Sequence, residues 1–460
     1  MQRCNCDTFV YLRKIISMRF HLKSHRPTLS FILILFIFCT HINAQKISKK
    51  ERKIVAQVEK NNPAAIAFLE KVVNVNSGTM NPEGVRETGR LFDNALSEIG
   101  FKTEWIAMPA EMNRAGHLFA TIDGDTGKRV LLIGHLDTVF EEDSEFQKFE
   151  RINDSIAKGP GANDMKGGDV IILYALKALR EKGLLNDAQI NVALNGDEES
   201  AGKPISISRK PLIEAAKNSD VALCFETSTG YDKATVARRG SSGWKVEVTG
   251  KRAHSSGIFS EHTGAGANFE MARILHQFYT DVKGEALLTF NPGMMLGGTT
   301  LNIDPEKSRG EVFGKSNVVA QAAYADGGLR FISEEQKERA RNKMREIVAN
   351  NLPQTSAKIT FTDSYPAMGP TDANYELLHK LDQVSQDLGQ PAVEAYDPGK
   401  RGAADISFVA QYLACLDGLG TMGGGAHTPS ETVNLNTIEA LTKRTAILIY
   451  RLINEKRPQS

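Results

Sequence analysis

The stretch from Val130 to Gly168 constrains the fold of this chain more than any other. It opens with an apolar run, residues 130–133, which predicts a buried strand of a parallel sheet. The run leads directly into Gly134-His135-Leu136-Asp137-Thr138. In open α/β sheets, ligands bind at the carboxyl ends of the strands. His135 and Asp137 are two residues apart on the departing chain and therefore point the same way. We predict one site, in which His135 is a ligand and Asp137 orients it.

The same stretch ends in a glycine-rich turn, residues 159–168, that carries Asp164. An apolar segment follows and predicts a helix over 169–182. An Asp at a helix N-terminus can simply be a cap. The glycines before it and the upstream histidine favour the other interpretation, a metal ligand.

Two further apolar strands are predicted to end in acids. Residues 190–195 lead into Glu198 and Glu199, and residues 221–225 lead into Glu226. An adjacent Glu pair in a charged loop is usually only a solvated surface. Here the pair follows a buried strand and lies between glycines, which favours a function. The repetition across three strands is stronger evidence than any single member.

Near the C-terminus a glycine run, residues 423–425, is followed by His427. Two His and several carboxylates suit Zn²⁺ or a similar divalent ion. The acids are too many for one tetrahedral ion with an open position, so two ions bridged by a carboxylate and a water use them better. One carboxylate must stay free of metal to act as a general base.

The pattern of elements predicts an α/β protein with a second domain inserted. A catalytic domain with a mostly parallel central sheet flanked by helices is expected over 45–242 and 365–460. Its expected elements include a helix pair within 47–75, a helix beginning at Arg401, and a strand over 416–422.

Residues 243–364 alternate as an antiparallel sheet with helices, in the order βαββαβ, and predict a ferredoxin-like α+β lid and dimerisation domain. Hinges are expected near 240–243 and 365–369, where Gly240 and Gly243 can absorb backbone rotation.

These motifs together resemble the M20 family of metallopeptidases, over nearly all of residues 50–455. The matching segments are 134–138, 161–167, 197–199, 225–226 and 425–427. Within the family, the chain most resembles the glutamate carboxypeptidase branch, because it has Glu226 at a position where other branches tend to have Asp. The resemblance implies two Zn²⁺ or similar divalent ions per chain. One would be held by His135 and Glu226 and the other by Glu199 and His427, with Asp164 bridging both. It implies that Asp137 orients His135 and that Glu198 is the catalytic base.

The insert resembles the family's lid at three predicted substrate-binding residues. His254 lies in Arg252-Ala253-His254-Ser255, a motif whose His contacts the substrate or the oxyanion, often across a dimer. Asn317 and Arg330 match the residues that hold substrate carbonyl and carboxylate. Two departures matter: the family's Asp-x-Arg reads Gly-Leu-Arg over 328–330, and Ser-Tyr at 364–365 stands where some glutamate-specific members have a further Arg. Strict glutamate preference is therefore not implied. Alternatively, His254 is only a solvated loop residue and Arg330 only pairs with a lid acid such as Glu334.

The leading hypothesis is a di-zinc metallo-exopeptidase, a carboxypeptidase that hydrolyses the bond next to a C-terminal amino acid such as glutamate. The alternative is an N-acyl-amino-acid amidohydrolase or dipeptidase with the same metal centre. A catalytically inactive binding module is a third hypothesis, which the complete ligand set opposes. The expected partners are a small peptide or N-acyl amino acid and a second copy of the chain, bound through the lid.

Composition narrows the class of partner. The chain has 460 residues, a net charge of +1, and 24% charged residues, so nothing in its charge suggests nucleic acid or an acidic surface as a partner. Two cysteines, Cys224 and Cys415, follow the N-terminal region, and two do not make a disulfide framework. We predict that both are buried thiols.

The N-terminal 44 residues predict a signal peptide. The apolar run 29–39 is short for a membrane span, follows basic residues, and is succeeded by Ala44, a plausible cleavage position. The alternative is a single-pass anchor. Met1 and Met18 are both candidate starts. We expect a periplasmic or secreted enzyme with no stable membrane span after cleavage.

This expectation is tested on the mature protein. N-terminal sequencing of the chain purified from its natural host should begin at Gln45, because cleavage follows Ala44. A mature chain that still carries residues 29–39 would contradict export by a cleaved signal and make the segment an anchor.

Overall fold

The computed structural model describes residues 47–305 and 307–457. The predicted signal peptide, residues 1–44, lies outside the described residues.

A six-stranded sheet in the order β1-β2-β6-β3-β7-β16 forms the centre of the larger domain. Strands β6 (Ala188–Asn195), β3 (Thr126–His135), β7 (Val221–Cys224) and β16 (Ala414–Leu416) run parallel, while β2 (His117–Ile122) pairs antiparallel with both β6 and β1 (Lys102–Ile106). The run 130–133 is completely buried, as expected for a strand covered on both faces. The predicted α/β class with a mostly parallel sheet is confirmed.

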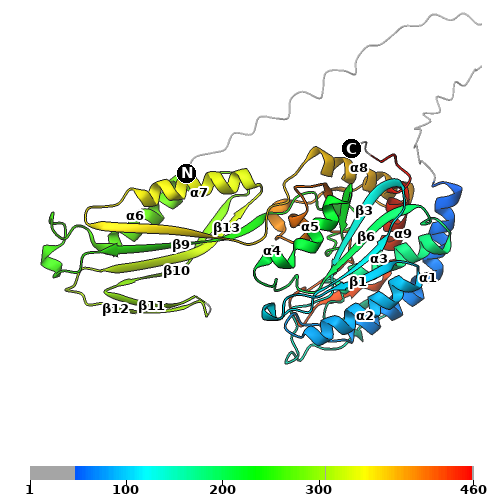
Figure 1. The fold of residues 1–460 in the computed structure, drawn as a ribbon, viewed down its shortest axis with the longest axis horizontal. Coiled ribbons are helices and arrows are strands. Elements are labelled where there is room, and N and C mark those ends of the chain that lie inside the picture. Colours follow the sequence, from blue (N-terminus) through cyan, green and yellow to red (C-terminus); the bar gives the residue numbers. More distant parts are fainter. Residues whose placement is uncertain (1–46, 306, 458–460) are drawn as a thin grey trace, which may run out of the picture. The chain divides into compact units, whose positions relative to one another are not determined.

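Helices cover both faces of this sheet (Figure 1). On one face, α1 (Lys49–Val73), α3 (Lys166–Glu181) and α9 (Leu435–Leu452) pack against one another. On the other, α5 (Lys210–Lys217) contributes Leu212 to a smaller core that includes Ile406 and Val409. Helix α2 (Pro82–Glu98) packs against β1 and β2, and α8 (Asp372–Asp387) packs against β16.

The prediction of a helix pair within 47–75 is wrong, because α1 is one continuous helix. Its buried residues Ile54, Val58, Leu69 and Val72 form a single stripe that continues past Pro63. Pro63 itself is exposed, so its ring lies away from the core. Packing of the stripe on both sides of the proline outweighs the local penalty for proline in a helix.

The smaller, lid domain is built on a four-stranded antiparallel sheet in the order β10-β13-β9-β14. The strands are β9 (Gly240–Gly250), β10 (Thr289–Gly298), β13 (Ala322–Phe331) and β14 (Thr355–Asp363). Helices α6 (Gly266–Gln277) and α7 (Glu334–Ala349) lie on one face of this sheet (Figure 1). Trp244, Met271 and Met344 belong to its separate core. The ferredoxin-like class of the lid is confirmed, while the domain boundaries stay predictions.

Two differences in the lid have a physical cause. A hairpin, β11 (Thr300–Asp304) and β12 (Arg309–Phe313), lies between β10 and β13 and was not predicted. Its residues are all exposed or half-buried, so they carry no alternation of buried and exposed positions to detect. Gly240 and Gly243, proposed as hinge residues, lie inside β9 and pair with Phe331 and Gly328 of β13. That pairing makes them part of the sheet rather than a free hinge.

Two predictions for the C-terminal part are also wrong. The expected helix from Arg401 is a short 3-10 turn, η5 (Asp405–Phe408), because Asp405 is drawn into a buried ion pair with Arg209. The expected strand 416–422 ends at Leu416, since Gly418 takes a positive φ of 74° and turns the chain.

The remaining elements are short. They are η1 (Ala110–Met112), β4 (Glu150–Arg151), β5 (Ile156–Lys158), α4 (Ile205–Ser208), β8 (Lys233–Ala234), η2 (Ser255–Gly257), η3 (Phe278–Val282), β15 (Glu394–Ala395), η4 (Pro398–Lys400), β17 (Gly423–Gly424) and β18 (Thr432–Asn434). Cys224 and Cys415 are free and buried, as predicted. Among the described residues, no helix has the length and apolar character needed to cross a membrane.

Candidate metal centre

Three neighbouring parallel strands end at one edge of the central sheet and deliver candidate ligands there. His135 is the last residue of β3 and pairs with Asn195, the last residue of β6. Glu198 and Glu199 follow within four residues of that strand end. On the other side of β3, Ile133 pairs with Cys224, the last residue of β7, two residues before Glu226. Parallel pairing therefore brings these side chains together although the sequence separates them by tens of residues.

The other two candidate ligands come from loops. Asp164 lies just before α3, and His427 lies in the turn between β17 and β18 with a positive φ of 62°. Glu431 connects the two loops: its Oε1 accepts hydrogen bonds from the backbone N–H of Asn163, at 2.8 Å, and of Asp164, at 3.0 Å. Sequence reasoning assigned Glu431 no role, because nothing local indicates which backbone a buried acid will hold.

The candidate ligand atoms form two groups that share Asp164. Nε2 of His135 lies 3.4 Å from Oδ1 of Asp164 and 3.8 Å from Oε1 of Glu226. Nε2 of His427 lies 3.2 Å from Oδ2 of Asp164 and 3.2 Å from Oε2 of Glu199. Tetrahedral coordination at about 2.1 Å separates ligand atoms by about 3.4 Å. The spacings agree with that value, and the two oxygens of Asp164 face different histidines.

The donor atoms fit a metal on a second ground. Nε2 of His135 is buried and has no hydrogen-bond partner within the described part of the chain. A buried polar atom without a partner is costly and rare, and a bound cation would satisfy it. The ligand atoms of His135, Asp164 and Glu199 lie within 4.8 Å of one another, and so do those of His135, Glu198 and Glu226. Distance alone therefore also permits Glu198 as a ligand.

The charges at this edge are unbalanced. Burial, together with the Asp405 carboxylate, raises the pKa of Glu198 well above its ordinary value. Burial and the Asp164 carboxylate raise the pKa of Glu226 to about 7. Burial alone would lower the pKa of His135, but Asp137 and Asp164 raise it well above its ordinary value. Without a cation, the cluster must hold extra protons to limit the repulsion between its carboxylates, and a divalent ion would replace them.

Asp137 contacts His135 and, beyond what the sequence predicts, also the loop of the adjacent Glu pair. Nδ1 of His135 lies 3.0 Å from the backbone carbonyl of Asp137 and 3.5 Å from its carboxylate. A hydrogen bond from Nδ1–H to that carbonyl leaves Nε2 free as a ligand. The carboxylate also accepts hydrogen bonds from the backbone N–H of Glu198, at 3.0 Å, and of Glu199, at 3.1 Å. The hydroxyl of Thr79 donates a third, at 2.6 Å. Asp137 thus holds the loop of the adjacent Glu pair in place.

The three predicted substrate-binding residues lie in the lid but not together. His254 forms a bridge with Val318, and the carbonyl of Asn317 accepts a hydrogen bond from Ser255 N–H at 2.9 Å. His254 and Asn317 are therefore neighbours beyond the end of β9. Arg330 is paired with Ser241 near the opposite end of that strand. From Ser241 to Gly250 a strand spans about 30 Å, so one chain holds these residues at two separate places.

Arg330 is exposed, and no ion pair to it occurs among the described residues. Glu334, the acid proposed as its alternative partner, pairs with Lys337. Arg239 lies close by, because its Nη1 donates to Oγ1 of Thr289 at 3.3 Å and Thr289 is paired with Arg330. Two guanidinium groups without a nearby acid form a candidate binding place for a carboxylate.

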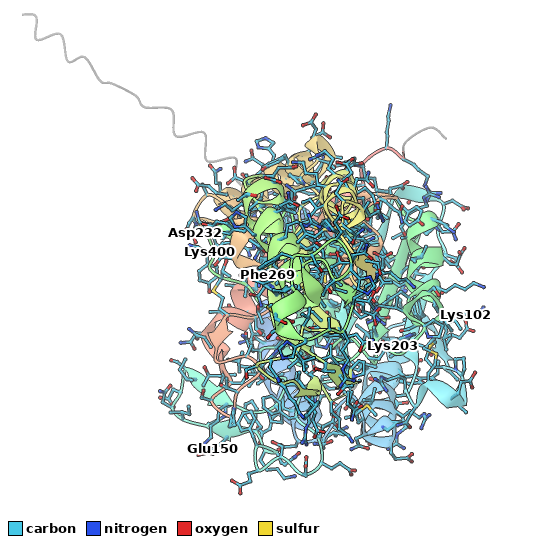
Figure 2. All side chains as sticks on the ribbon, turned by 90° about the vertical axis from the view of Figure 1, so that its left-hand side faces the viewer. Lys102, Glu150, Lys203, Asp232, Phe269 and Lys400 are labelled. Atoms are coloured by element: carbon cyan, nitrogen blue, oxygen red, sulfur yellow. The ribbon has the colours of Figure 1, made fainter. Side chains whose placement is uncertain are left out.

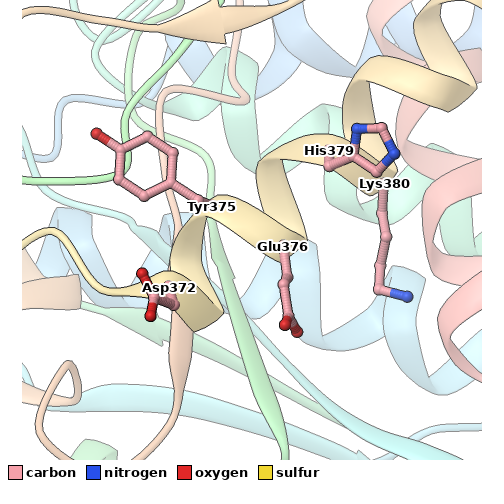
Figure 3. A pocket seen from close by; sticks show the side chains of 5 residues that line it. All are labelled: Asp372, Tyr375, Glu376, His379 and Lys380. Atoms are coloured by element: carbon pink, nitrogen blue, oxygen red, sulfur yellow. The ribbon is translucent and has the colours of Figure 1, made fainter.

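A surface hollow elsewhere contains none of the candidate residues. It lies on α8, has a volume of about 490 Å³, and is lined by Asp372, Tyr375, Glu376, His379 and Lys380 (Figure 3). Its lining offers no set of convergent metal ligands, so the strand edge is the candidate site.

Comparison with known proteins identifies the family of this chain. The model of peptidase family M20/M25/M40 matches residues 131–451. The chain is 27% identical over 434 residues to carboxypeptidase G2 of Pseudomonas sp. strain RS-16, covering 93% of this chain and 98% of that protein.

Two solved structures share the fold. Aminopeptidase PepT of Bacillus cereus is similar with a TM-score of 0.68 and 17% identity, over 85% of this chain and 99% of that one. The Bacillus subtilis YXEP protein, described as a dinuclear metal-binding peptidase from the M20 family, has a TM-score of 0.59 and 12% identity, over 86% and 99%. With the family model matched from within β3 to the end of α9, the chain belongs to peptidase family M20/M25/M40 and is a metallopeptidase.

Proposed function

We propose that this metallopeptidase is a di-zinc exopeptidase that releases a C-terminal amino acid, such as glutamate, from a small peptide or N-acyl substrate. The observation that carries the proposal is the position of Asp164, whose two carboxylate oxygens face His135 and His427 separately. That arrangement suits a carboxylate shared by two ions, with His135 and Glu226 on one side and Glu199 and His427 on the other. We also propose that the enzyme is exported, on the strength of the predicted signal peptide.

The chain's own residues supply the proton transfers. In this proposal the carboxylate of Glu198 takes a proton from the attacking water and returns it to the leaving amine. Its backbone is held by Asp137, so the carboxylate stays aimed at the reacting atoms. Two bound zinc ions would lower the pKa of a water and polarise the scissile carbonyl.

Arg330 is proposed to bind the free carboxylate of the substrate. A free carboxylate distinguishes the end of a peptide from an internal bond. A guanidinium group that binds this carboxylate through two hydrogen bonds would therefore select for the chain end. Arg239 next to Arg330 adds a second positive charge. An acidic C-terminal residue such as glutamate, with two carboxylates, fits this pair better than a neutral one.

We propose that the site is completed by a second copy of the chain. A substrate of two or three residues is at most about 11 Å long, so it cannot reach both Arg330 and the His254 of the same lid. Phe259 and Phe269 beside the His254 loop are 69% and 53% exposed with ring centroids 5.6 Å apart, and Phe269 lies on the face shown in Figure 2. Such a patch suits contact between two lids.

The base is tested by Glu198→Gln. The variant should keep about two zinc ions per chain, as in the wild type, and lose on the order of 10²–10⁴-fold in kcat, because an amide cannot accept the proton. Metal analysis of chelator-free preparations and turnover of an N-acyl-L-glutamate measure both. Near-normal activity would place the base elsewhere, and one ion or none in the wild type would contradict the di-zinc centre.

The carboxylate contact is tested by Arg330→Ala with two substrates, an N-acyl-L-glutamate and its α-amide. The variant should lose a large factor in kcat/KM on the free acid and much less on the amide, because only the acid loses a charged partner. Lys315→Ala, at another exposed lid position, serves as the control. Equal losses on both substrates would mean that Arg330 supports the lid instead.

The second copy is tested by mixing two variants. His254→Ala and Glu198→Gln, each expected to be nearly inactive, are co-expressed with different tags and the doubly tagged dimer is purified. If His254 acts across the interface, one of the two sites has both residues intact, and about half of the wild-type activity returns. An inactive mixed dimer would place His254 in the site of its own chain, and a monomer by light scattering would exclude the dimer.

A wider set of acylated amino acids separates the alternative function. An N-acyl-amino-acid amidohydrolase would turn over acylated amino acids with neutral side chains as well as N-acyl-L-glutamate. A dipeptidase would require the free amino group that these substrates lack.

A further inference from the structure

The backbone of Glu198 is held on both sides. Its N–H donates to Oδ1 of Asp137 at 3.0 Å, and its carbonyl accepts a hydrogen bond from the hydroxyl of Tyr365 at 2.8 Å. Tyr365 is two residues beyond the end of β14, on the connection that leaves the lid. A side chain outside the strand edge therefore reaches the peptide that carries the proposed base.

The direction of the Tyr365 hydroxyl is set by a buried cation. Nη2 of Arg209 lies 3.3 Å from the hydroxyl oxygen and can only donate, so the hydroxyl proton is directed to the Glu198 carbonyl. Arg209 is completely buried and pairs with two carboxylates, Asp197 and Asp405, the latter at 2.6 Å. Nη2 also donates to the carbonyl of Asp197 at 3.1 Å.

The buried ion pairs make Arg209 rigid. Asp405 accepts a further hydrogen bond from Asn195, and Asp197 accepts one from Gly202 N–H at 2.8 Å. Removing either partner of a buried ion pair leaves an uncompensated charge, so the arrangement has one low-energy geometry. Arg209 thus holds the Tyr365 hydroxyl in a fixed position through its hydrogen bond.

Tyr365 is also fixed at its ring and its backbone. The ring packs on Phe408 with centroids 4.9 Å apart. Its carbonyl accepts a hydrogen bond from Ser241 N–H at 2.8 Å, which ties the outgoing connection of the lid to the first residues of β9. Three residues on, Met368 pairs with Arg238 of the incoming connection. The two chain connections of the lid therefore form one paired unit that includes Tyr365.

We propose that Tyr365 is a positioning residue for the general base: its hydroxyl, fixed by Arg209, holds the Glu198 peptide so that the carboxylate is aimed at the reacting water. This proposal rests on the assignment of Glu198 as the base. Because Tyr365 lies on the connection between the lid and the catalytic domain, the orientation of the Glu198 carboxylate then depends on that connection. Tyr365 touches neither ligands nor substrate in this role and acts only through Glu198.

The test is Tyr365→Phe, which removes one oxygen and keeps the packing on Phe408. We expect kcat on an N-acyl-L-glutamate to fall about tenfold, the effect of one hydrogen bond on a positioned group. KM, the zinc content and the midpoint of thermal unfolding should stay close to those of the wild type. The control is Tyr375→Phe on α8, whose side chain is exposed (Figure 3) and which should change nothing.

A double-mutant cycle separates positioning from general support. In a Glu198→Gln background, Tyr365→Phe should change the residual rate less than twofold, because the group that it positions no longer accepts a proton. A tenfold loss in both backgrounds, or no loss in the wild-type background, would overturn the proposal. A Glu198→Gln variant that remains fully active would instead overturn the assignment of the base, so the two failures are distinguishable.

Discussion

The parallel pairing of β3 with β6 on one side and β7 on the other is the interaction on which the rest of this structure depends. The three strands are buried, so their ladder hydrogen bonds have no competition from water and their register is firm. That register places His135, the Glu198–Glu199 pair and Glu226 at one edge. A shift of β6 by one residue would turn the side chains of its departing chain to the opposite face and dissolve the cluster.

This edge concentrates negative charge in a buried place, and the surrounding structure is arranged to support it. Backbone N–H groups of Glu198 and Glu199 bind Asp137, those of Asn163 and Asp164 bind Glu431, and the guanidinium of Arg209 lies between Asp197 and Asp405. Each of these contacts satisfies one carboxylate while fixing a loop. The carboxylates left facing His135 and His427 are those without such partners, and a divalent cation suits them.

The lid is a separate domain whose proposed substrate-binding residues lie far apart. Its sheet has its own core and carries proposed substrate contacts at two places that a strand length separates. Arg330 lies at the end of β13 that pairs with the start of β9, near the chain connections, whereas His254 and Asn317 lie beyond the other end. The proposed second copy of the chain would reconcile these positions with one small substrate. Tyr365, on one of the connections, reaches the Glu198 peptide, so that the lid connection and the proposed base share one hydrogen-bonded unit.

The sequence alone determined the strand-end pattern, the α/β class with an inserted ferredoxin-like lid, and the candidate ligands. Buried strands are recognisable as apolar runs in the sequence, and the turns between them as glycine-rich interruptions. Its local errors have local causes: the apolar spacing over 47–75 predicts two helices where one buried stripe continues, and the exposed β11–β12 hairpin has no buried face to detect. Only the tertiary structure decided which atoms meet. Arg209 and Asp405 are 196 residues apart, Tyr365 and Glu198 are 167 apart, and the Asp137 carboxylate, 3.5 Å from His135, also holds the backbone of the Glu pair. Such contacts follow from the register of packed elements, and no local pattern specifies the partner of a buried charge.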